Sequence, residues 1–354
     1  MRIAVKYGAL STAPLVGPDG HAVTESGQAT MARRLLELYP GAVVVGNEAQ
    51  LTPEFEIVTL GSLDPENTLV INLDVLDSVC VFQRLHRGGA EPKIMNFQWI
   101  NPSTYHHPVN FAALGLSYAF FPTFCSGERT AAEVREIVSR WAIPSLANRA
   151  RIASSELGID ASRPVSHSDL DEPIVLYPAI TMDARKQPGE FFKIVANVAR
   201  RTPIRVVARL APSALTTTPA LHLATQRWSK VTPLLSSQDD YWTELSRTTA
   251  FVATAVEEAY GLQYVEAMRA GAIGILPNRP WAKRLVPDTY PYLYNTTAEA
   301  EEMLYEAVTN PQLASDKVDE AVGGGHFTSW IREHHDRTRF DQAFKAKVNE
   351  WFAV

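Results

Sequence analysis

The chain has 354 residues, of which 46% are hydrophobic and 20% are charged, so it has the composition of a globular protein rather than a disordered or fibrous one. The net charge of −6 argues against strong nonspecific binding to nucleic acid. The two cysteines, Cys80 and Cys125, are too few and too far apart for a zinc ribbon or a disulfide framework, and they fit a reducing cytoplasm.

The length of the chain and its first residues bear on the number of domains and on the location of the protein. A chain of 354 residues exceeds what one hydrophobic core usually organises, so two α/β domains are expected. The first residues, MRIAVKYGAL, are too short and too soon polar for a signal peptide, and no run of apolar residues is long enough to span a membrane. We therefore expect a cytoplasmic protein without a membrane span.

In the first half of the chain, short apolar segments alternate with helical patterns. The helical spacing of Met31, Leu35 and Leu38 predicts a helix over Gln28–Leu38. Near-continuous apolar runs are typical of parallel strands buried on both faces. The predicted strands are Ile3–Tyr7, Ala42–Val45, Thr68–Asn72, Lys93–Trp99 and Ala119–Pro122. Alternation of this kind indicates a doubly wound α/β sheet.

The pattern restarts after a polar segment at 160–173, DASRPVSHSDLDEP, and we place a domain boundary there, between 165 and 166. The predicted elements that follow are a strand Ile174–Tyr177, a helix Gly189–Arg200, a strand Ile204–Ala208, a helix Tyr241–Ser246, a strand Ala250–Thr254, a helix that opens at Gly261, and a strand Ile273–Leu276. The last stretch, Thr328–Phe352, is predicted to be helical, with apolar anchors at Trp330, Phe340, Phe344, Val348 and Trp351.

The most informative segment covers residues 254–281, TAVEEAYGLQYVEAMRAGAIGILPNRPW. It follows a predicted strand, and Gly261 opens a helix that Gly271 closes. A glycine at the opening lets a phosphate approach the backbone N–H groups that the first helical turn leaves unpaired. The helix dipole adds partial positive charge at the same place. The segment therefore predicts a metal-free diphosphate site at Gly261, Leu262 and Gln263.

Two glutamates lie eight residues apart across this junction. Glu258, just before the helix, can accept hydrogen bonds from sugar hydroxyls, and Glu266, two turns into it, can accept both hydroxyls of a ribose. The alternative is that both are ordinary surface acids, with Glu258 merely complementing the helix dipole. The glycine positions, the buried strand before them and the LPNRPW loop after them favour a site.

The segment EAYGLQYVEAMRAG resembles the E-x7-E signature of retaining GT-B glycosyltransferases, whose usual form is E-G-F-G-L-x-x-x-E-A-M-A-x-G. Within that superfamily it is most similar to the queuosine-tRNA mannosyltransferase type. The shared segments are LGID (157–160), KQPGEFFKIV (186–195), YWTEL (241–245), LPNRPW (276–281) and YPYLY (290–294). The resemblance covers about 157–300 and extends weakly to 93–137. A segment near the C-terminus, RTRFDQAFKAKV, is faintly similar to phage enzymes that glycosylate hydroxymethylated DNA bases.

This resemblance implies an α/β GT-B fold in which two Rossmann-like domains face a cleft. Residues 1–165 would form the N-terminal, acceptor-side domain and 166–330 the nucleotide-sugar-binding domain. Residues 331–354 would be a helix that crosses back to the first domain. The loop that leads to Gly27 would contact the acceptor or a phosphate, with an ordinary strand-to-helix loop as the alternative.

The chain departs from the family pattern at two places. The family uses an Arg four or five residues before a Lys to neutralise the diphosphate. Lys186 matches the Lys, Thr181 stands in place of the Arg, and Arg185 is a candidate substitute.

The second departure is in the first domain, where the family has a His near the reactive carbon of the sugar. Gln98 occupies that place, and His106 and His107 are candidate replacements.

The expected reaction is transfer of a hexosyl or pentosyl group, with retention, from a UDP- or GDP-linked sugar to an acceptor hydroxyl. The resemblance implies no resident cofactor, and because no DxD motif stands in a suitable place we expect no metal. The acceptor would be a modified base of DNA or tRNA, or else a glycan, a lipid or a small molecule. Candidate phosphate contacts for a polynucleotide are Arg33, Arg34, Arg84, His86, Arg87 and Lys93. The non-transferase alternatives are a nucleotide-sugar epimerase of the same fold and a noncatalytic nucleotide-sugar-binding module.

Overall fold

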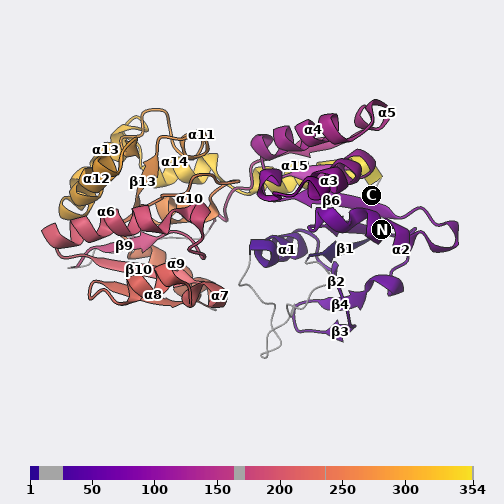
Figure 1. Cartoon of the computed structure of the whole chain (residues 1–354), viewed down its shortest axis with the longest axis horizontal. Helices are drawn as coiled ribbons and strands as arrows, with labels where there is room; N and C mark the ends of the chain where they lie inside the picture. Colours follow the sequence, from indigo (N-terminus) through magenta and orange to yellow (C-terminus); the bar gives the residue numbers. More distant parts are fainter. Residues whose placement is uncertain (8–26, 163–171, 236, 353–354) are drawn as a thin grey trace. The chain divides into compact units, whose positions relative to one another are not determined.

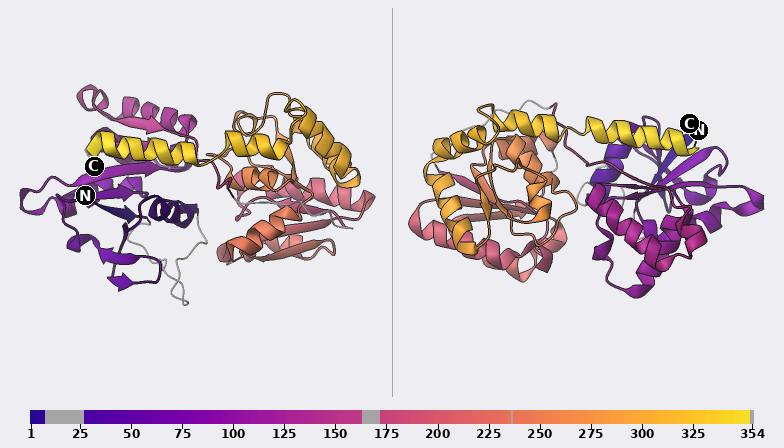
Figure 2. Two further views of the ribbon diagram at one scale, coloured as in Figure 1. Left: turned by 180° about the vertical axis from the view of Figure 1, so that it is seen from behind. Right: turned by 90° about the horizontal axis from the view of Figure 1, so that it is seen from above.

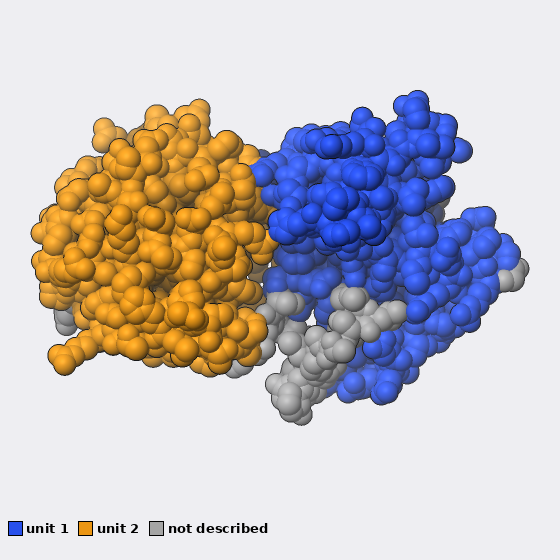
Figure 3. All heavy atoms as spheres, in the orientation of Figure 1, with its two compact units in different colours: residues 1–157, 338–354 blue, residues 158–337 orange. Residues whose placement is uncertain are grey.

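The computed structural model describes residues 1–7, 27–162, 172–235 and 237–352. The chain divides into two compact units, which Figure 3 colours separately: Met1–Leu157 with Thr338–Val354, and Gly158–Arg337. The predicted boundary between 165 and 166 lies outside the described residues. None of the described helices is both long and apolar enough to cross a membrane.

Unit 1 is built on a sheet of eight strands among its described residues, in the order β3-β4-β2-β1-β5-β6-β7-β8 (Figure 1). Its elements are β1 (Arg2–Lys6), α1 (Gly27–Leu38), β2 (Val43–Gly46), β3 (Gln50–Leu51), β4 (Glu56–Thr59), β5 (Thr68–Asn72), α2 (Ser78–Leu85), β6 (Lys93–Gln98), α3 (Pro108–Phe120), β7 (Thr123–Cys125), α4 (Glu128–Trp141), α5 (Pro144–Ala147), β8 (Ile152–Ser154) and α15 (Thr338–Phe352). Every pairing is parallel except that of β3 with β4.

Side chains alternate between the two faces of this sheet, as the pleat requires. On β6, Ile94 belongs to the core cluster that includes Val81 and Leu85 of α2. Phe97 faces the other way and packs against Phe344 of α15, with ring centroids 5.5 Å apart. Helix α15, the yellow helix that carries the C label in Figure 2, is thereby part of unit 1. The helix predicted over 331–354 to return to the first domain begins at Thr338, and residues 331–337 belong to unit 2.

Two sequence predictions are wrong in detail. In Ala119–Pro122, predicted as a strand, the first two residues end helix α3, the next two form a short loop, and the strand begins at Thr123. The helix continues because its apolar positions Leu114 and Tyr118 keep helical spacing against the core. The stretch Thr328–Phe352 is two helices rather than one.

The break in that stretch lies at residues 335–337, between α14 (Phe327–His334) and α15. There the backbone leaves the helix to pair with another segment of unit 2. The amide of Ile159 donates to the carbonyl of His335 at 2.6 Å, and that of Arg337 donates to the carbonyl of Ile159 at 2.9 Å. Gly158, at φ +61, makes this approach possible, because a Cβ there would lie 2.7 Å from the amide of Arg337.

Unit 2 has a six-stranded sheet among its described residues, in the order β11-β10-β9-β12-β13-β14, with every pairing parallel. Its elements are β9 (Ile174–Tyr177), α6 (Pro188–Arg201), β10 (Arg205–Leu210), α7 (Pro212–Leu215), α8 (Thr218–Ala224), β11 (Ser229–Pro233), α9 (Gln238–Ser246), β12 (Ala250–Val252), α10 (Leu262–Arg269), β13 (Ile273–Pro277), α11 (Pro280–Lys283), β14 (Leu293–Tyr294), α12 (Thr297–Thr309), α13 (Pro311–Glu320) and α14. Helix α12 packs on α6, and helix α10 packs on α9 and α14.

The strand order fixes where a ligand would bind in unit 2. From β9 the chain winds outward through β10 and β11, and it then returns to add β12, β13 and β14 on the other side of β9. The winding direction therefore reverses between β9 and β12. In open parallel sheets, ligands bind outside the carboxyl ends of the strands at such a switch point.

Candidate functional site

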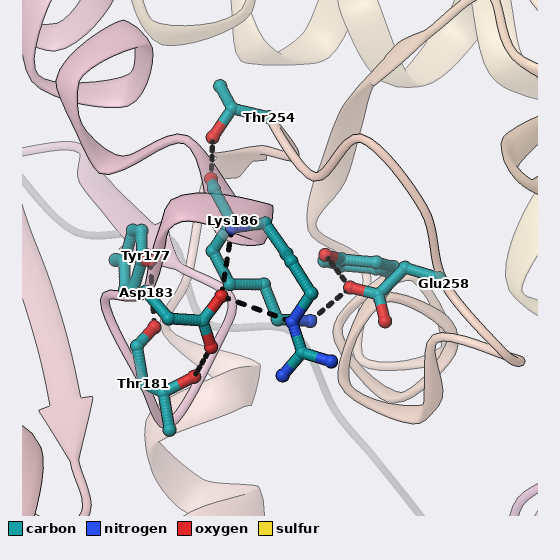
Figure 4. Close-up of polar contacts among 8 residues, drawn as sticks. Tyr177, Thr181, Asp183, Lys186, Thr254 and Glu258 are labelled. Atoms are coloured by element: carbon teal, nitrogen blue, oxygen red, sulfur yellow. Dashed lines mark hydrogen bonds and ion pairs between the residues drawn. The ribbon is translucent and has the colours of Figure 1, made fainter. Parts of the chain in front are cut away.

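The two loops that leave the switch point of unit 2 carry the site residues predicted for that unit. The loop after β9 holds Lys186, and the loop after β12 holds Glu258. Backbone bonds tie the loops together, since the amide of Val256 donates to the carbonyl of Arg185 at 2.9 Å. The hydroxyl of Thr254 donates to the carbonyl of Lys186 at 2.7 Å (Figure 4). The switch point thus brings together two segments that are 72 residues apart in sequence.

Lys186 and Glu258 meet directly. The ammonium group of Lys186 pairs with Oε1 of Glu258 (Figure 4). The hydroxyl of Tyr264 donates to the same oxygen at 2.6 Å. The side chains are 22% exposed for Lys186 and 14% exposed for Glu258, so both are largely withdrawn from water yet still accessible. A cation and a carboxylate held this way can bind a phosphate oxygen and a hydroxyl side by side.

Thr181, which stands where the family has an Arg, stabilises its own loop. Its hydroxyl donates to Oδ2 of Asp183 at 2.9 Å, and its carbonyl accepts from the hydroxyl of Tyr177 at 2.9 Å (Figure 4). The amide of Arg185 donates to Oδ1 of Asp183 at 2.9 Å, and its guanidinium Nε lies 3.5 Å from the same oxygen. The Arg185 side chain is 59% exposed, so its guanidinium is accessible to an anion beside Lys186.

Gly261 begins helix α10 in the left-handed conformation, with φ +93. A Cβ at this position would lie 2.6 Å from Cδ2 of Tyr264, so only glycine fits both the backbone and the space. The amides of Leu262 and Gln263 fall in the first helical turn, and no acceptor for them occurs among the residues the structure describes. Unpaired first-turn amides and the helix dipole are the features that allow a helix start to bind an anion, and here they lie at the position given by the sequence.

Glu266 lies on the same helix, two turns from Gly261. Oε2 of Glu266 accepts a hydrogen bond from the hydroxyl of Tyr241 at 2.6 Å. Burial raises the pKa of Glu266 to about 7, and the bond from Tyr241 opposes that rise. The second carboxylate oxygen has no partner among the described residues, so it is available to accept a hydrogen bond.

Unit 1 holds the other predicted site residues. The carboxamide of Gln98 is buried, donating to the carbonyl of Ile100 at 2.6 Å and accepting from the hydroxyl of Tyr118 at 2.8 Å. His106 is exposed. Gly27 starts helix α1 against the ring of Trp99, where a Cβ would lie 2.9 Å from Cζ3. The loop before Gly27 lies outside the described residues.

His107 has a structural role at the start of α3. Its Nδ1 accepts from the amide of Val109 at 3.2 Å, which caps the helix.

Sequence reasoning missed a polar network at the switch point of unit 1, between β1 and β5. The ammonium group of Lys6, 1% exposed at the end of β1, pairs with Oδ2 of Asp77 at 2.6 Å. The side-chain amide of Asn72 donates to Oδ1 of Asp77 at 2.9 Å. Burial and the neighbouring Asp77 raise the pKa of Asp74. The signal for this network is the lysine that ends an otherwise apolar strand, followed by the NLDVLD segment at 72–77.

The expected phosphate contacts of unit 1 need correction at Arg34. This side chain is 8% exposed, and its guanidinium donates to Oδ1 of Asp341 on α15 at 3.2 Å while lying 4.3 Å from the ring centroid of Phe340. Arg34 therefore anchors the C-terminal helix and is not presented to a ligand. Its position on an amphipathic helix gave no sign of this, because the partner is 307 residues away.

A basic cluster lies near the amino ends of the unit 1 strands and consists of Arg84, His86, Arg87 and Lys93. Lys93 is the first residue of β6, whereas Gln98, at its carboxyl end, is the last. The ammonium group of Lys93 donates to the carbonyl of Glu66, and the ring of His86 stacks on Phe82. The cluster and the unit 1 switch point therefore lie at opposite ends of the strands.

No protein-family model and no curated protein matches the sequence. Solved structures do match the fold. A sucrose-phosphate synthase from Thermosynechococcus elongatus superposes with a TM-score of 0.70 at 12% identity, over 99% of each chain. A UDP-forming trehalose-phosphate synthase from Burkholderia xenovorans, in complex with glucose-6-phosphate, gives a TM-score of 0.70 at 10% identity, over 99% of this chain and 100% of that one.

A third similar structure is that of a TarM mutant from S. aureus in complex with fondaparinux, alpha-GlcNAc-glycerol and UDP. It gives a TM-score of 0.60 at 12% identity, over 81% of this chain. The chain spans 56% of that TarM chain. At these identities the likeness establishes the fold. The predicted GT-B fold, with two parallel-sheet units, is confirmed.

Proposed function

We propose that the protein is a retaining glycosyltransferase that moves a sugar from a nucleoside diphosphate sugar to an acceptor hydroxyl. One observation carries the proposal: the Lys186–Glu258 pair and the first-turn amides of α10 lie together at the switch point of unit 2. A cation and unpaired amides suit a diphosphate, and a carboxylate beside them suits sugar hydroxyls. The UDP in the TarM structure and the name of the UDP-forming synthase support a UDP-linked donor.

Each residue has a distinct part in donor binding. The diphosphate is held by the amides of Leu262 and Gln263 and by Lys186, with Arg185 at the exposed side. Glu266 accepts from the ribose. Glu258 accepts from a hydroxyl of the sugar, next to the bond that breaks. A GDP-linked donor would use the same contacts, since none of them touches the base.

The mechanism that we propose for sugar transfer depends on stabilising the negative charge that develops on the leaving phosphate. As the bond from the anomeric carbon to the diphosphate oxygen breaks, negative charge builds on the leaving phosphate, and fixed donors at that point lower the barrier. The acceptor oxygen bonds to the same face of the anomeric carbon, and its proton passes to the departing phosphate oxygen. The amides and Lys186 supply the positive charge, so we propose that the reaction requires no metal.

For the acceptor we propose a small hydroxyl compound that binds at the switch point of unit 1, where the side chain of Asp77 is 25% exposed beside the buried Lys6 and Asn72. The complex of the trehalose-phosphate synthase with glucose-6-phosphate supports a small polar acceptor. A base of DNA or tRNA, which the sequence resemblance raises, remains a prediction. Arg34 is paired with Asp341, and the cluster at 84–93 lies near the amino ends of the strands. Most of the basic residues expected to contact a polynucleotide are therefore not placed to do so.

A donor screen tests the proposal. Selective binding raises the melting temperature by mass action, so UDP-, GDP- and ADP-linked sugars are compared by thermal shift, each with and without EDTA. The sugar that stabilises the protein is then incubated with glycan, small-molecule and polynucleotide acceptors, and NMR identifies the anomeric configuration of the product. Inversion, or binding of the donor with neither transfer nor hydrolysis, would contradict the proposal. The second of these results would identify a noncatalytic binding module.

A further inference from the structure

The ring of Tyr264 stacks on two other aromatic rings. It stacks on Phe251 of β12, with centroids 5.8 Å apart and planes at 13°, and on Trp281 of α11, at 5.3 Å and 30°. Tyr264 is 2% exposed and Trp281 is 1% exposed. A buried ring with two stacked aromatic neighbours has little freedom to move, and such pairs add stability beyond their buried area. The position of the Tyr264 hydroxyl is therefore set by the core of unit 2.

The hydroxyl of Tyr264 forms a hydrogen bond with the carboxylate of Glu258. It donates to Oε1 at 2.6 Å, the oxygen that also pairs with Lys186. Within the described ranges, no residue donates to Oε2. Burial and the adjacent carboxylate raise the pKa of Tyr264 well above its ordinary value, so the phenol stays protonated and remains a donor. One carboxylate oxygen is held from the protein side, and the other is left for a ligand.

The same ring also packs under the start of helix α10. A Cβ at Gly261 would lie 2.6 Å from Cδ2 and 3.2 Å from Cε2 of Tyr264. Tyr264 therefore touches both parts of the site, the carboxylate through its hydroxyl and the amide turn through its ring. These two contacts can be separated experimentally, because replacing Tyr by Phe removes the hydroxyl and keeps the ring.

We propose that Tyr264 is a positioning residue of the donor site, whose hydroxyl orients the Glu258 carboxylate toward the sugar while its ring supports the diphosphate-binding turn. The inference rests on the proposed function, since it assigns Glu258 to the sugar. It leads to a specific expectation: the hydroxyl matters for the sugar and not for the nucleoside diphosphate. A purely structural role for Tyr264 would affect both alike.

The test compares Tyr264→Phe with the matched control Tyr290→Phe. Tyr290 is also buried in unit 2, and among the described residues its hydroxyl bonds only to the backbone of Gly274, accepting from the amide at 3.2 Å and donating to the carbonyl at 2.9 Å. Calorimetry measures the Kd of UDP, and UDP release from UDP-glucose gives kcat and KM. For Tyr264→Phe we expect an unchanged Kd for UDP and a fall in kcat of about tenfold or more, because a hydrogen bond to a charged group is lost. Tyr290→Phe should retain both values.

A variant with 4-aminophenylalanine at position 264, which keeps the ring and an N–H donor, should recover most of kcat. Three results would overturn the inference: wild-type kcat in Tyr264→Phe, an equal loss of UDP affinity and kcat, or loss of the fold in Tyr264→Phe but not in Tyr290→Phe. Failure of UDP to bind the wild-type protein would instead count against the UDP donor of the proposed function.

Discussion

Tyr241 on α9 donates a 2.6 Å hydrogen bond to Glu266 on α10, and it thereby joins the two helices at the place assigned to the ribose. The same bond partly offsets the effect of burial, which raises the pKa of Glu266 to about 7. The protonation state of Glu266 therefore changes near neutral pH, and so does its capacity to accept two ribose hydroxyls.

Donor affinity should consequently fall as the pH drops below about 7. Only the ionised Glu266 can accept from both hydroxyls, so the Kd of UDP should rise roughly tenfold per pH unit well below that pKa. Tyr241→Phe removes the bond that opposes the rise in pKa and should move the midpoint to higher pH. Calorimetry from pH 5.5 to 8.5 measures the effect, with Glu266→Gln as the control expected to give a flat profile. A flat wild-type profile would remove Glu266 from the ribose site.

The two glutamates of the motif should differ in kinetic effect. Glu266→Ala should mainly raise the KM of the donor, because a ribose contact is present in the ground state and the transition state alike. Glu258→Gln should mainly lower kcat, by roughly tenfold or more, since the carboxylate lies next to the reacting bond. Glu306→Gln is a suitable control, because Glu306 is a paired carboxylate on α12. If both substitutions left kcat and KM at wild-type values, the E-x7-E motif would have no part in the mechanism.

His335 should make the protein less stable in acid. Burial lowers the pKa of His335 to about 4 from an ordinary 6.5, and its Nδ1 lies 2.7 Å from the hydroxyl of Tyr260. Between these values the unfolded chain binds the proton and the folded chain does not. The free energy of unfolding therefore falls as the pH drops from 6.5 to 4, by about 3 kcal/mol at most.

Glu266 acts in the opposite direction over much of the same window. Its pKa is raised, so its folded form binds the extra proton and gains stability as the pH falls from 7 to 4.5. The His335 effect is therefore read as the difference between wild-type protein and His335→Gln in urea unfolding at pH 7 and pH 5. An equal loss of stability in both proteins would show that His335 is not the cause.

Removal of the basic cluster in unit 1 should leave transfer unchanged. Arg84 and Arg87 lie near the amino ends of the strands, away from the carboxyl ends where ligands bind in such sheets. Arg84→Ala with Arg87→Ala should have wild-type rates on every acceptor, across a series of salt concentrations. Transfer to a polynucleotide that weakens steeply with salt in the wild type, with a slope reduced by about one for each arginine removed, would restore the cluster as a phosphate contact.

The parts of the structure that were predictable are those encoded locally. The strands Thr68–Asn72 and Ile174–Tyr177 have the predicted bounds, because buried parallel strands are continuous apolar runs. Strand β11, SKVTP, was missed because it lies at the sheet edge and none of its residues is fully buried. Ala119–Pro122 has strand propensity, yet the tertiary packing of α3 extends the helix to Phe120.

Within the site, too, the features encoded in one local segment were predictable and those set by tertiary contacts were not. Glu258, Gly261 and Glu266 lie on one continuous segment, so their spacing could be recognised in the sequence. The pairing of Glu258 with Lys186 and of Glu266 with Tyr241 could not be recognised, because these partners come from other loops and helices that the strand order brings together. Tyr264 is within the motif, but its contact with Glu258 depends on a stack that includes Trp281, which lies beyond the next strand.

A crystal structure of the protein with UDP would show whether the first turn of α10 and Lys186 bind the diphosphate of the donor. We expect phosphate oxygens about 2.7–3.2 Å from the amide nitrogens of Leu262 and Gln263, with the ammonium group of Lys186 in contact with them and the ribose hydroxyls on Glu266. A diphosphate bound elsewhere on the protein, with these amides still unoccupied, would contradict this assignment.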